Sequence, residues 1–391
     1  MLKYSVGLDI SANQIHCCIS VIDGSQRTTV KSTRKIANTK KGFTELGGWI
    51  ARHQKDKSIP LVVCMEATGV YYEHCALYLF KAGLRVSVVL PNQAKKYLQA
   101  CGQKSKNDRV DARGLAQMGA EKSLRIWNPM GEYFYVLREL TRQNQTLNEL
   151  RTAESNRLHA LELGMYNSKP VISQVKKILK LIDKQIAQTE ELIGKHIESD
   201  PEIAKKVDRL CTIKSVGIKT VATVLAETNG FELFTNARQL ASFAGYDVIE
   251  NQSGKHNGRT RISKQGNSHI RRILYMPALV AVGHRVAPFF DLYQRTYQRH
   301  RIKMKSYVAV QKKILVVIYA LWKKNEPFSP QTEENKHTEE RKPESPLGAE
   351  AVADENQGKD VKKIVPAEPA LHKVDIPSEQ SPYVSSRVLQ S

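Results

Sequence analysis

The sequence predicts a mixed α/β domain at the N-terminus, followed by a helical hairpin and a mainly helical C-terminal domain. Three observations lead to this fold class: closely spaced strand patterns in the first 37 residues, alternating helix and strand patterns up to residue 120, and mostly helical periodicity from residue 132 onward. At 391 residues, of which 41% are hydrophobic, the chain is long enough for two or three domains with cores of their own.

Three strand patterns open the chain. They cover residues 4–10, 14–22 and 27–37, and turn-type clusters separate them, which predicts an antiparallel meander. The elements expected next are, in order, a helix (40–54), a strand (60–66), a helix (71–82), a strand (84–90) and helices between 92 and 120. A meander followed by alternating helices and strands is the element order of an RNase H-like fold.

The segment from about 132 to 197 is helical and highly polar. Its apolar residues recur at spacings of three, seven and eight, and the pattern is broken at Asn167-Ser168-Lys169-Pro170. We therefore expect two long helices that form a hairpin of coiled-coil type. Two interpretations of this hairpin remain open: a solvated structural spacer and an oligomerisation arm.

Two short helical patterns flank Val216-Gly217-Ile218 within residues 207–227. This arrangement resembles a helix-hairpin-helix, in which the glycine lets backbone amides approach a phosphate at the start of the second helix. The alternative is a packing element between helices. On the binding interpretation, the candidate nucleic-acid contacts are Lys214, Gly217 and Lys219.

The sequence divides into four parts. We expect an α/β domain over 1–125, the helical hairpin over 130–200, a mainly α C-terminal domain over 205–327 and a tail over 328–391. The tail is rich in Pro, Glu, Ser and Lys and has one aromatic residue, Tyr383, so we expect it to be disordered.

Charge indicates a polyanionic partner. Lysine and arginine total 60 against 39 acidic residues, which gives a net charge of +21. The tail from Ser329 contributes 8 basic and 12 acidic residues, so the whole basic excess belongs to the part that we expect to fold. Nucleic acid is the first candidate.

A membrane is the competing partner for a basic protein. However, the longest apolar stretches, 276–283 and 314–322, are much shorter than the ~18 residues that a span requires. Because the chain enters a strand pattern at once, we expect no signal peptide and a cytoplasmic location. The six cysteines show no CxxC spacing, which favours reduced core residues over disulfides or zinc ligands.

Four acidic residues in the first third of the chain are the main candidates for chemistry. Asp9 and Glu66 lie in apolar strand patterns, where a buried, unpaired carboxylate is costly. Asp108 and Asp111 are three residues apart, so a helix places both carboxylates on one face. Like charges at this distance repel each other, and a bound cation is the natural remedy.

The second chemically rich segment, 246–272, is a basic, glycine-containing loop that leads into a helical run at 269–282. Ser263 should lie just before that helix, where free amides and the helix dipole favour an anion. No histidine-acid pair is adjacent to it, although His256 and His269 flank the loop. The residues alone therefore favour a capping or phosphate-binding serine over a nucleophile. Further candidate nucleic-acid contacts are Lys255, Arg259, Arg261, Lys264, Arg271 and Arg272.

Five motifs occur in register along the chain. They are Gly7-Leu8-Asp9-Ile10-Ser11, Met65-Glu66-Ala67-Thr68-Gly69-Val70-Tyr71, Asn107-Asp108-Arg109-Val110-Asp111-Ala112, the Val216-Gly217-Ile218 hairpin, and Arg261-Ile262-Ser263-Lys264-Gln265-Gly266-Asn267 with Ile270-Arg271-Arg272. Together, over about residues 4–325, they resemble the DEDD transposases of the insertion-sequence 110 family, relatives of the Piv DNA invertases. Asn107 and Gln265 depart from the family's frequent residues, but neither change removes a reactive group.

This resemblance implies a RuvC-like catalytic domain in which Asp9, Glu66, Asp108 and Asp111 hold Mg2+, with Mn2+ as a possible substitute. Four carboxylates can hold two ions about 3.5–4 Å apart. The resemblance also implies that Ser263 attacks DNA and becomes covalently joined to it, which reverses the interpretation from the residues alone. Metal ions would then supply the missing activation of the serine hydroxyl.

Family resemblance further implies the partners. They are donor and target DNA, a structured noncoding bridge RNA that pairs with both, and copies of the chain itself, as a homodimer that assembles into a homotetramer. Delegating specificity to base pairing suits a basic protein without a recognisable major-groove reading motif. The resemblance places the protein in a bacterial or archaeal cytoplasm.

Other functions use similar features. A RuvC-type junction nuclease would use the same acids with water as the nucleophile, and a Piv-like invertase would need no guide RNA. Sugar kinases also begin with a Gly-x-Asp strand, but no later glycine-rich adenosine loop is present. A non-catalytic architectural protein is disfavoured because all four acids are intact.

Overall fold

The computed structural model describes residues 1–103, 107–250, 252–254, 256–258 and 260–329. The tail expected from residue 328 lies, from residue 330 on, outside the described residues, and so do the candidate contacts Lys255 and Arg259. Among the described residues, no helix is long and apolar enough to cross a membrane.

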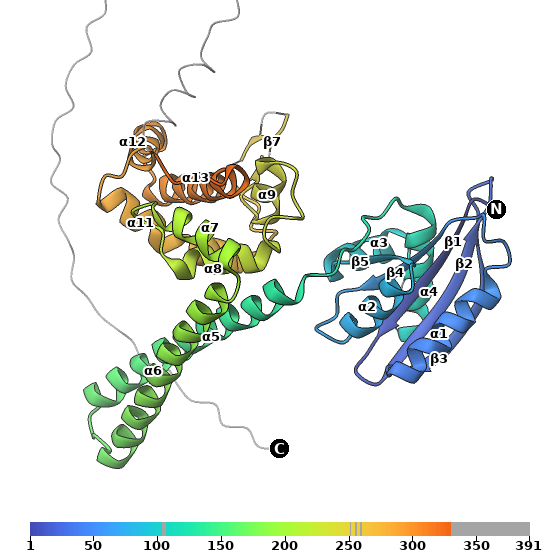
Figure 1. Ribbon diagram of the computed structural model, residues 1–391, viewed down its shortest axis with the longest axis horizontal. Helices are drawn as coiled ribbons and strands as arrows, with labels where there is room; N and C mark the ends of the chain where they lie inside the picture. Colours follow the sequence, from blue (N-terminus) through green and yellow to red (C-terminus); the bar gives the residue numbers. More distant parts are fainter. Residues whose placement is uncertain (104–106, 251, 255, 259, 330–391) are drawn as a thin grey trace, which may run out of the picture. The chain divides into compact units, whose positions relative to one another are not determined.

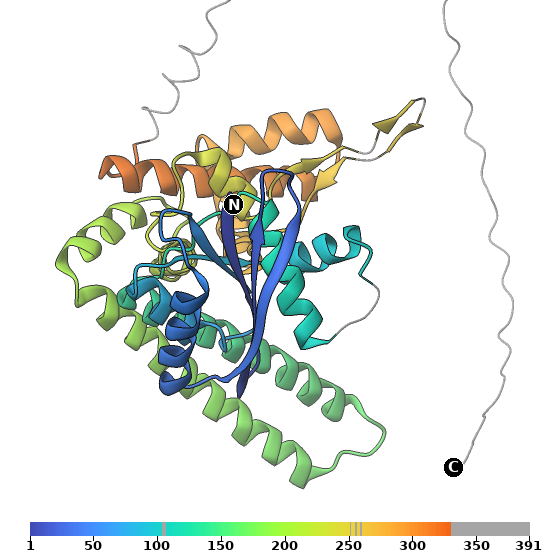
Figure 2. The same cartoon turned by 90° about the vertical axis from the view of Figure 1, so that its right-hand side faces the viewer.

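A five-stranded mixed sheet forms the centre of the N-terminal domain (Figures 1 and 2). Its strands are β1 (Lys3–Ile10), β2 (Gln14–Ile22), β3 (Thr28–Ala37), β4 (Leu61–Glu66) and β5 (Arg85–Val89). The order across the sheet is β3-β2-β1-β4-β5, in which β1, β2 and β3 are antiparallel neighbours while β4 and β5 run parallel to β1. The predicted meander is confirmed, and the topology is consistent with an RNase H-like fold.

Helices cover both faces of this sheet. They are α1 (Lys40–His53), α2 (Glu73–Lys81), α3 (Pro91–Ala100) and α4 (Asp108–Glu121). Successive strand residues point to opposite faces. In β1, Val6 and Leu8 pack in a core with α1 and α2, so Gly7 and Asp9 face the other side. In β4 the same alternation places Met65 in that core and Glu66 on the side of α4.

Close packing of α4 on the sheet depends on small residues. A Cβ atom on Gly7 would lie 2.1 Å from the Ala112 carbonyl oxygen and 2.2 Å from the Ala116 nitrogen, so only glycine allows this approach. Farther along, a Cβ on Gly119 would lie 2.3 Å from Ser5 Oγ. Since β1 ascends from Ser5 to Gly7 while α4 descends from Gly119 to Ala112, the two elements run antiparallel. The first turn of α4 therefore lies over the end of β1.

The helical hairpin is confirmed, with helices α5 (Glu132–Leu163) and α6 (Lys169–Glu198). Its base belongs to the C-terminal core, because Leu137 and Ile193 are buried there. Toward the tip the two helices are joined by the ion pair of Arg151 with Asp183, 2.6 Å apart. We use the name arm for residues 132–198 from here on.

The C-terminal domain packs mainly around α8 and α13. Its helices are α7 (Pro201–Cys211), α8 (Ile218–Thr228), α9 (Ala237–Phe243), α10 (Ser268–Ile273), α11 (Tyr275–Gly283), α12 (Phe289–His300) and α13 (Lys303–Lys324). Two short ribbons leave this core, and their strands are β6 (Val248–Ile249) with β9 (Arg261–Ile262), and β7 (Gln252–Ser253) with β8 (His256–Asn257). Every residue of α8 from Thr220 to Thr228 is buried.

One predicted helix is divided in the structure. The run expected at 269–282 forms α10 and α11, which meet at Leu274. Pro277 explains the division, because it has no N–H to donate to the Ile273 carbonyl and its ring hinders a continuous helix. The cysteines agree with the sequence more closely: all six are free thiols, and Cys17, Cys18, Cys64 and Cys75 are buried.

We expect Gly7→Ala to destabilise the protein by roughly 2 kcal/mol, because the added methyl group meets backbone atoms of α4 that cannot move independently. Thermal unfolding of the variant should show a lower melting temperature than that of the wild type. The matched control is Gly48→Ala, an exposed position inside α1 with no atom within 4 Å of the added Cβ, which should be neutral or stabilise slightly. Equal melting temperatures for both variants would contradict the role of Gly7.

Candidate functional site

The structure brings the four candidate acids to one edge of the sheet. Leu8 of β1 pairs with Met65 of β4 in parallel register, so Asp9 and Glu66 follow at the carboxyl ends of neighbouring strands. Both face the side of the sheet that α4 covers, and α4 begins there with Asp108 and carries Asp111 one turn later. The sequence overestimated the burial of Asp9 and Glu66, because strand ends open to solvent and both residues are only partly buried.

The start of α4 is fixed by a side-chain cap. Asn107 Oδ1 accepts a hydrogen bond from the Val110 amide at 2.9 Å, which satisfies one free amide of the first turn. Asp108 and Asp111 lie in that turn, where the helix dipole favours negative charge. The sequence reasoning missed His16, which pairs with Asp9 across β1 and β2 and whose Nε2 lies 3.4 Å from Asp108 Oδ2.

Other polar groups surround the remaining acids. Gln103 Nε2 donates to Asp111 Oδ1 at 3.4 Å, and Thr68 Oγ1 donates to Glu66 Oε1 at the same distance. Within the described residues, no three side chains of His, Cys, Asp or Glu converge closely enough to form a metal-binding group. The donor set nevertheless fits a hard divalent cation, because it consists of carboxylates gathered at one sheet edge.

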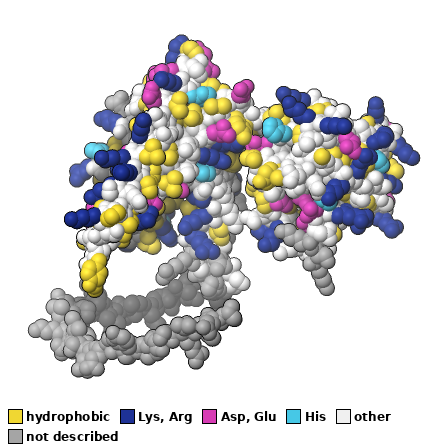
Figure 3. Space-filling view, turned by 90° about the horizontal axis from the view of Figure 1, so that it is seen from below, with side chains coloured by type: hydrophobic (Ala, Val, Ile, Leu, Met, Phe, Trp, Pro, Cys, Tyr) yellow, Lys and Arg dark blue, Asp and Glu magenta, His cyan; other side chains and the backbone are white. Residues whose placement is uncertain are grey.

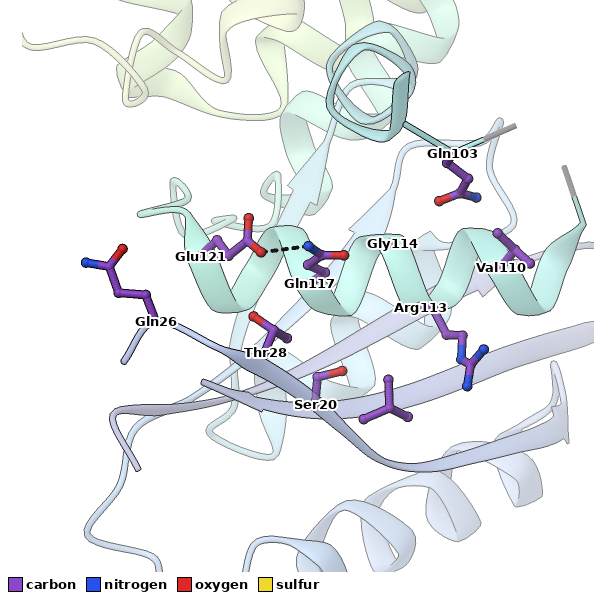
Figure 4. A pocket seen from close by; sticks show the side chains of 10 residues that line it. Ser20, Gln26, Thr28, Gln103, Val110, Arg113, Gly114, Gln117 and Glu121 are labelled. Carbon is purple, nitrogen blue, oxygen red and sulfur yellow. Dashed lines mark hydrogen bonds between the residues drawn. The ribbon is translucent and has the colours of Figure 1, made fainter. Parts of the chain in front are cut away.

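A hollow of about 540 Å³ runs along α4 beside this edge (Figure 4). Its walls come from β2, the start of β3 and one side of α4, and Gln117 donates a hydrogen bond to Glu121 along that helix at 2.7 Å. Gln103 lines the hollow and also contacts Asp111, so the hollow begins next to the acids.

Ser263 lies in a loop held by backbone hydrogen bonds. The Ser263 amide donates to the Asp247 carbonyl at 2.7 Å and the Lys264 amide donates to the Gly245 carbonyl at 3.2 Å. At the end of the loop, the Asn267 amide donates to the Phe243 carbonyl at 2.8 Å. We call residues 263–267 the serine loop.

The Ser263 hydroxyl is partly buried and contacts backbone. It donates to the Gly245 carbonyl at 3.3 Å and accepts from the Gln265 amide at the same distance, and these are its hydrogen bonds within the described residues. The expectation of a capping serine is wrong, because Asn267 caps α10 by accepting from the Ile270 amide. The hydroxyl is thus oriented without serving the helix.

A buried carboxylate lies behind the serine loop. The side chain of Glu227 in α8 is 2% exposed and accepts two hydrogen bonds from Arg142 of α5, at 2.7 and 2.9 Å. It also accepts one from Asn267 Nδ2 at 2.6 Å. Burial raises the pKa of the Glu227 carboxyl, but the hydrogen bonds from Arg142 and Asn267 outweigh burial, so the pKa lies below its ordinary value.

The candidate nucleic-acid contacts have different surroundings. Lys214 and Gly217 are exposed at the turn before α8, and the amides that start α8 have no side-chain cap. Lys219 forms an ion pair with Glu190 of the arm at 2.7 Å, and Arg272 pairs with Glu149. Arg271 donates to the Ala244 carbonyl at 2.7 Å. Arg261 and Lys264 are exposed.

Two family models match the chain over these same regions. A DEDD transposase model of the IS110 group matches residues 6–166, which include all four acids, and the model described as transposase IS116/IS110/IS902 family matches residues 207–294, which include Ser263. The chain belongs to the IS110 family of transposases. It is therefore a DNA-cleaving and rejoining enzyme, and membership of a DEDD family implies a divalent metal ion as cofactor.

Individual relatives of this IS110-family chain agree with the assignment. The pilin gene-inverting protein of Moraxella bovis is 29% identical over 329 residues, which cover 84% of this chain and 98% of that protein. The transposase for insertion sequence element IS1111A of Coxiella burnetii is 25% identical, over 68% of this chain and 79% of that protein. The solved structure of RuvC from T. thermophilus with a Holliday junction substrate covers 30% of this chain and 93% of that one, at 13% identity and a TM-score of 0.24. That last likeness is too small to bear on function.

The lowered pKa of Glu227 predicts a pH-dependent contribution to stability. A folded-state pKa below the ordinary value of 4.5 means that the charged carboxylate stabilises the fold above that pH, and that this contribution is lost as the pH falls through the folded pKa. At pH 7, Glu227→Gln should lower the free energy of unfolding by about 2 kcal/mol, and the difference from the wild type should shrink below about pH 5.

Denaturant unfolding of both proteins from pH 7 down to the acid limit of folding measures this difference. The control Asp183→Asn removes an exposed carboxylate from its pair with Arg151, and it should change stability little at any pH. A difference between wild type and Glu227→Gln that stays constant with pH would rule out the charged state of Glu227 as its source.

Proposed function

We propose that this IS110-family enzyme is a recombinase with a RuvC-like catalytic domain, and that it cuts and rejoins DNA through a covalent phosphoserine on Ser263. The observation that carries the proposal is the setting of Ser263: its hydroxyl is partly open and is held only by backbone groups among the described residues, in a loop with hydrogen bonds at both ends. A side chain held in this way has no packing or capping duty that would explain it.

The reaction balances without an external energy source. Attack forms a bond from Ser263 Oγ to phosphorus and breaks the bond from phosphorus to one deoxyribose oxygen. The serine loses its proton and the departing oxygen gains one. Because one phosphate ester replaces another, the reverse attack by a different DNA end can rejoin the strand without ATP.

Asp9, Glu66, Asp108 and Asp111 are the residues that would hold Mg2+, or Mn2+ in its place. Bound there, the ion would supply Lewis-acid stabilisation of the negative charge on the phosphate. His16 beside Asp108 and Gln103 beside Asp111 orient two of these carboxylates. The serine and the acids belong to different domains, and we propose that both are required.

The arm supports assembly of several copies into a dimer and then a tetramer. Toward its tip, large apolar side chains are exposed on both helices, and these are Leu150, Leu163, Met165, Tyr166, Ile178, Leu181 and Leu192. Figure 3 shows hydrophobic side chains at the surface among those of Lys and Arg. Apolar stripes of this kind on two long helices are typical of surfaces that pair with another helix.

We also propose that the protein binds donor and target DNA, and that a bridge RNA guides it to both. The net charge of +21 and the uncapped amides before α8 support binding to phosphate backbones rather than reading of base edges. A second candidate function is DNA inversion without a guide RNA, which is favoured by the match to a pilin gene-inverting protein over 98% of that protein's length. A specific RNA that co-purifies with the protein and pairs with its DNA sites would separate the two.

Ser263→Ala should abolish covalent attachment of DNA to the protein, because alanine has no oxygen to form the phosphoester. The measurement is a denaturing gel of end-labelled substrate DNA incubated with the protein and Mg2+. Ser253→Ala, which removes an exposed hydroxyl from the β7–β8 ribbon, should leave the adduct intact. Cleavage by the wild type without any adduct would favour the junction nuclease that uses water.

Replacing an exposed apolar residue of the arm should weaken self-association. Leu181 is 59% exposed in α6, and Leu181→Glu places a charge on the proposed contact surface. Sedimentation should show a smaller assembly or a dissociation constant raised at least about tenfold. The control Lys184→Ala, an exposed position one turn away, should sediment as the wild type does. An unchanged assembly in Leu181→Glu would remove the arm tip from the interface.

A further inference from the structure

Three segments that are distant in the sequence meet at the carboxylate of Glu227. Arg142 belongs to α5 of the arm, Glu227 to the last turn of α8, and Asn267 to the end of the serine loop. The two carboxylate oxygens accept three hydrogen bonds, two from Arg142 and one from Asn267. A carboxylate that is 2% exposed must be neutralised and hydrogen-bonded, so this cluster has one favourable arrangement.

Asn267 fixes the end of the serine loop through all of its polar groups. Its Nδ2 donates to Glu227, its Oδ1 caps α10 by accepting from the Ile270 amide at 3.1 Å, and its backbone amide donates to Phe243. The preceding residue packs tightly against the same segment, because a Cβ atom on Gly266 would lie 2.4 Å from the Phe243 carbonyl oxygen. Ser263 is four residues earlier than Asn267, so its position depends on where Asn267 is held.

The arm contacts this region along one face of α5. Arg142, Gln145 and Glu149 are spaced by three and four residues, which places them on the same side of the helix. Gln145 Oε1 lies 2.6 Å from His269 Nδ1, and Glu149 pairs with Arg272, so the contact continues from the serine loop onto α10. Burial lowers the pKa of His269, and the nearby Glu227 charge only partly offsets this, so a neutral imidazole faces Gln145.

We propose that Glu227 is a positioning residue that couples the arm to the serine loop: it holds Asn267 against Arg142, and the geometry of attack by Ser263 therefore depends on the position of α5. The proposal rests on the proposed function for the role of Ser263. Its consequence is that the same helix that extends into the proposed assembly arm also fixes the nucleophile. A protomer whose α5 is displaced should bind DNA but attack it poorly.

Hydrogen-bond polarity makes the proposal testable. Arg142 and Asn267 Nδ2 are all donors toward Glu227, so the isosteric Glu227→Gln places an NH2 group against another donor. Asn267 could turn its amide to accept from that group, but it would then present a donor to the Ile270 amide and lose the cap of α10. The second substitution Asn267→Asp removes this conflict, because an aspartate side chain accepts from the introduced glutamine amide and is also a good helix cap.

Two measurements on the full-length protein test the coupling. Hydrogen exchange follows the amides of Ser263, Lys264 and Asn267, which are hydrogen-bonded in the structure, and the denaturing gel follows the rate of adduct formation. In Glu227→Gln we expect amide exchange about tenfold faster and adduct formation about tenfold slower, with DNA affinity within about twofold of the wild type. The double variant E227Q/N267D should restore both rates to within about threefold.

Asp183→Asn, which breaks an exposed ion pair of the arm, is the control and should change neither rate. Exchange in Glu227→Gln that matches the wild type, or a double variant no better than Glu227→Gln, would overturn the coupling. If the wild type forms no adduct, the proposed phosphoserine mechanism fails, while hydrogen exchange still decides whether Glu227 holds the loop. Loss of DNA affinity equal to the loss of adduct would assign Glu227 to binding and overturn the positioning role.

Discussion

The approach of α4 to the central sheet is the constraint on which the acidic edge depends. Gly7 lets the backbone of α4 contact β1 near Ala112 and Ala116, and this contact sets both the height and the direction of the helix. Asp108 and Asp111 reach the strand ends of Asp9 and Glu66 only because α4 runs antiparallel to β1 at this distance. Four carboxylates that are far apart in sequence thus share one edge as a result of steric contact, before any ion contributes.

The C-terminal domain reaches its arrangement through a different kind of constraint. Its serine loop has few apolar side chains to pack, and hydrogen bonds hold it instead: backbone pairs to Gly245 and Asp247, and the Asn267 side chain to a buried carboxylate. Packing tolerates small shifts, whereas a buried charge that needs three donors does not. A loop that must present a hydroxyl accurately benefits from the second kind of constraint.

Sequence patterns predicted the elements better than the contacts among them. The meander, the hairpin and the acids were readable because strand alternation, helical spacing and charge are local signals. Glu227 was not readable, since it lies in an otherwise apolar helix and its partners are 85 and 40 residues away. The capping role predicted for Ser263 belongs to Asn267, and Pro277 divides a helix that periodicity alone made continuous.

The base of the arm is part of the C-terminal core, and this limits how the protein can be divided. Leu137 of α5 and Ile193 and Ile197 of α6 are buried among the residues of α8 and α13. A fragment that began at residue 205 would expose the apolar surface that these side chains cover and would also leave Glu227 without Arg142. Recombination between related proteins of this kind would therefore succeed at boundaries before residue 132, where the arm travels together with the serine that it supports.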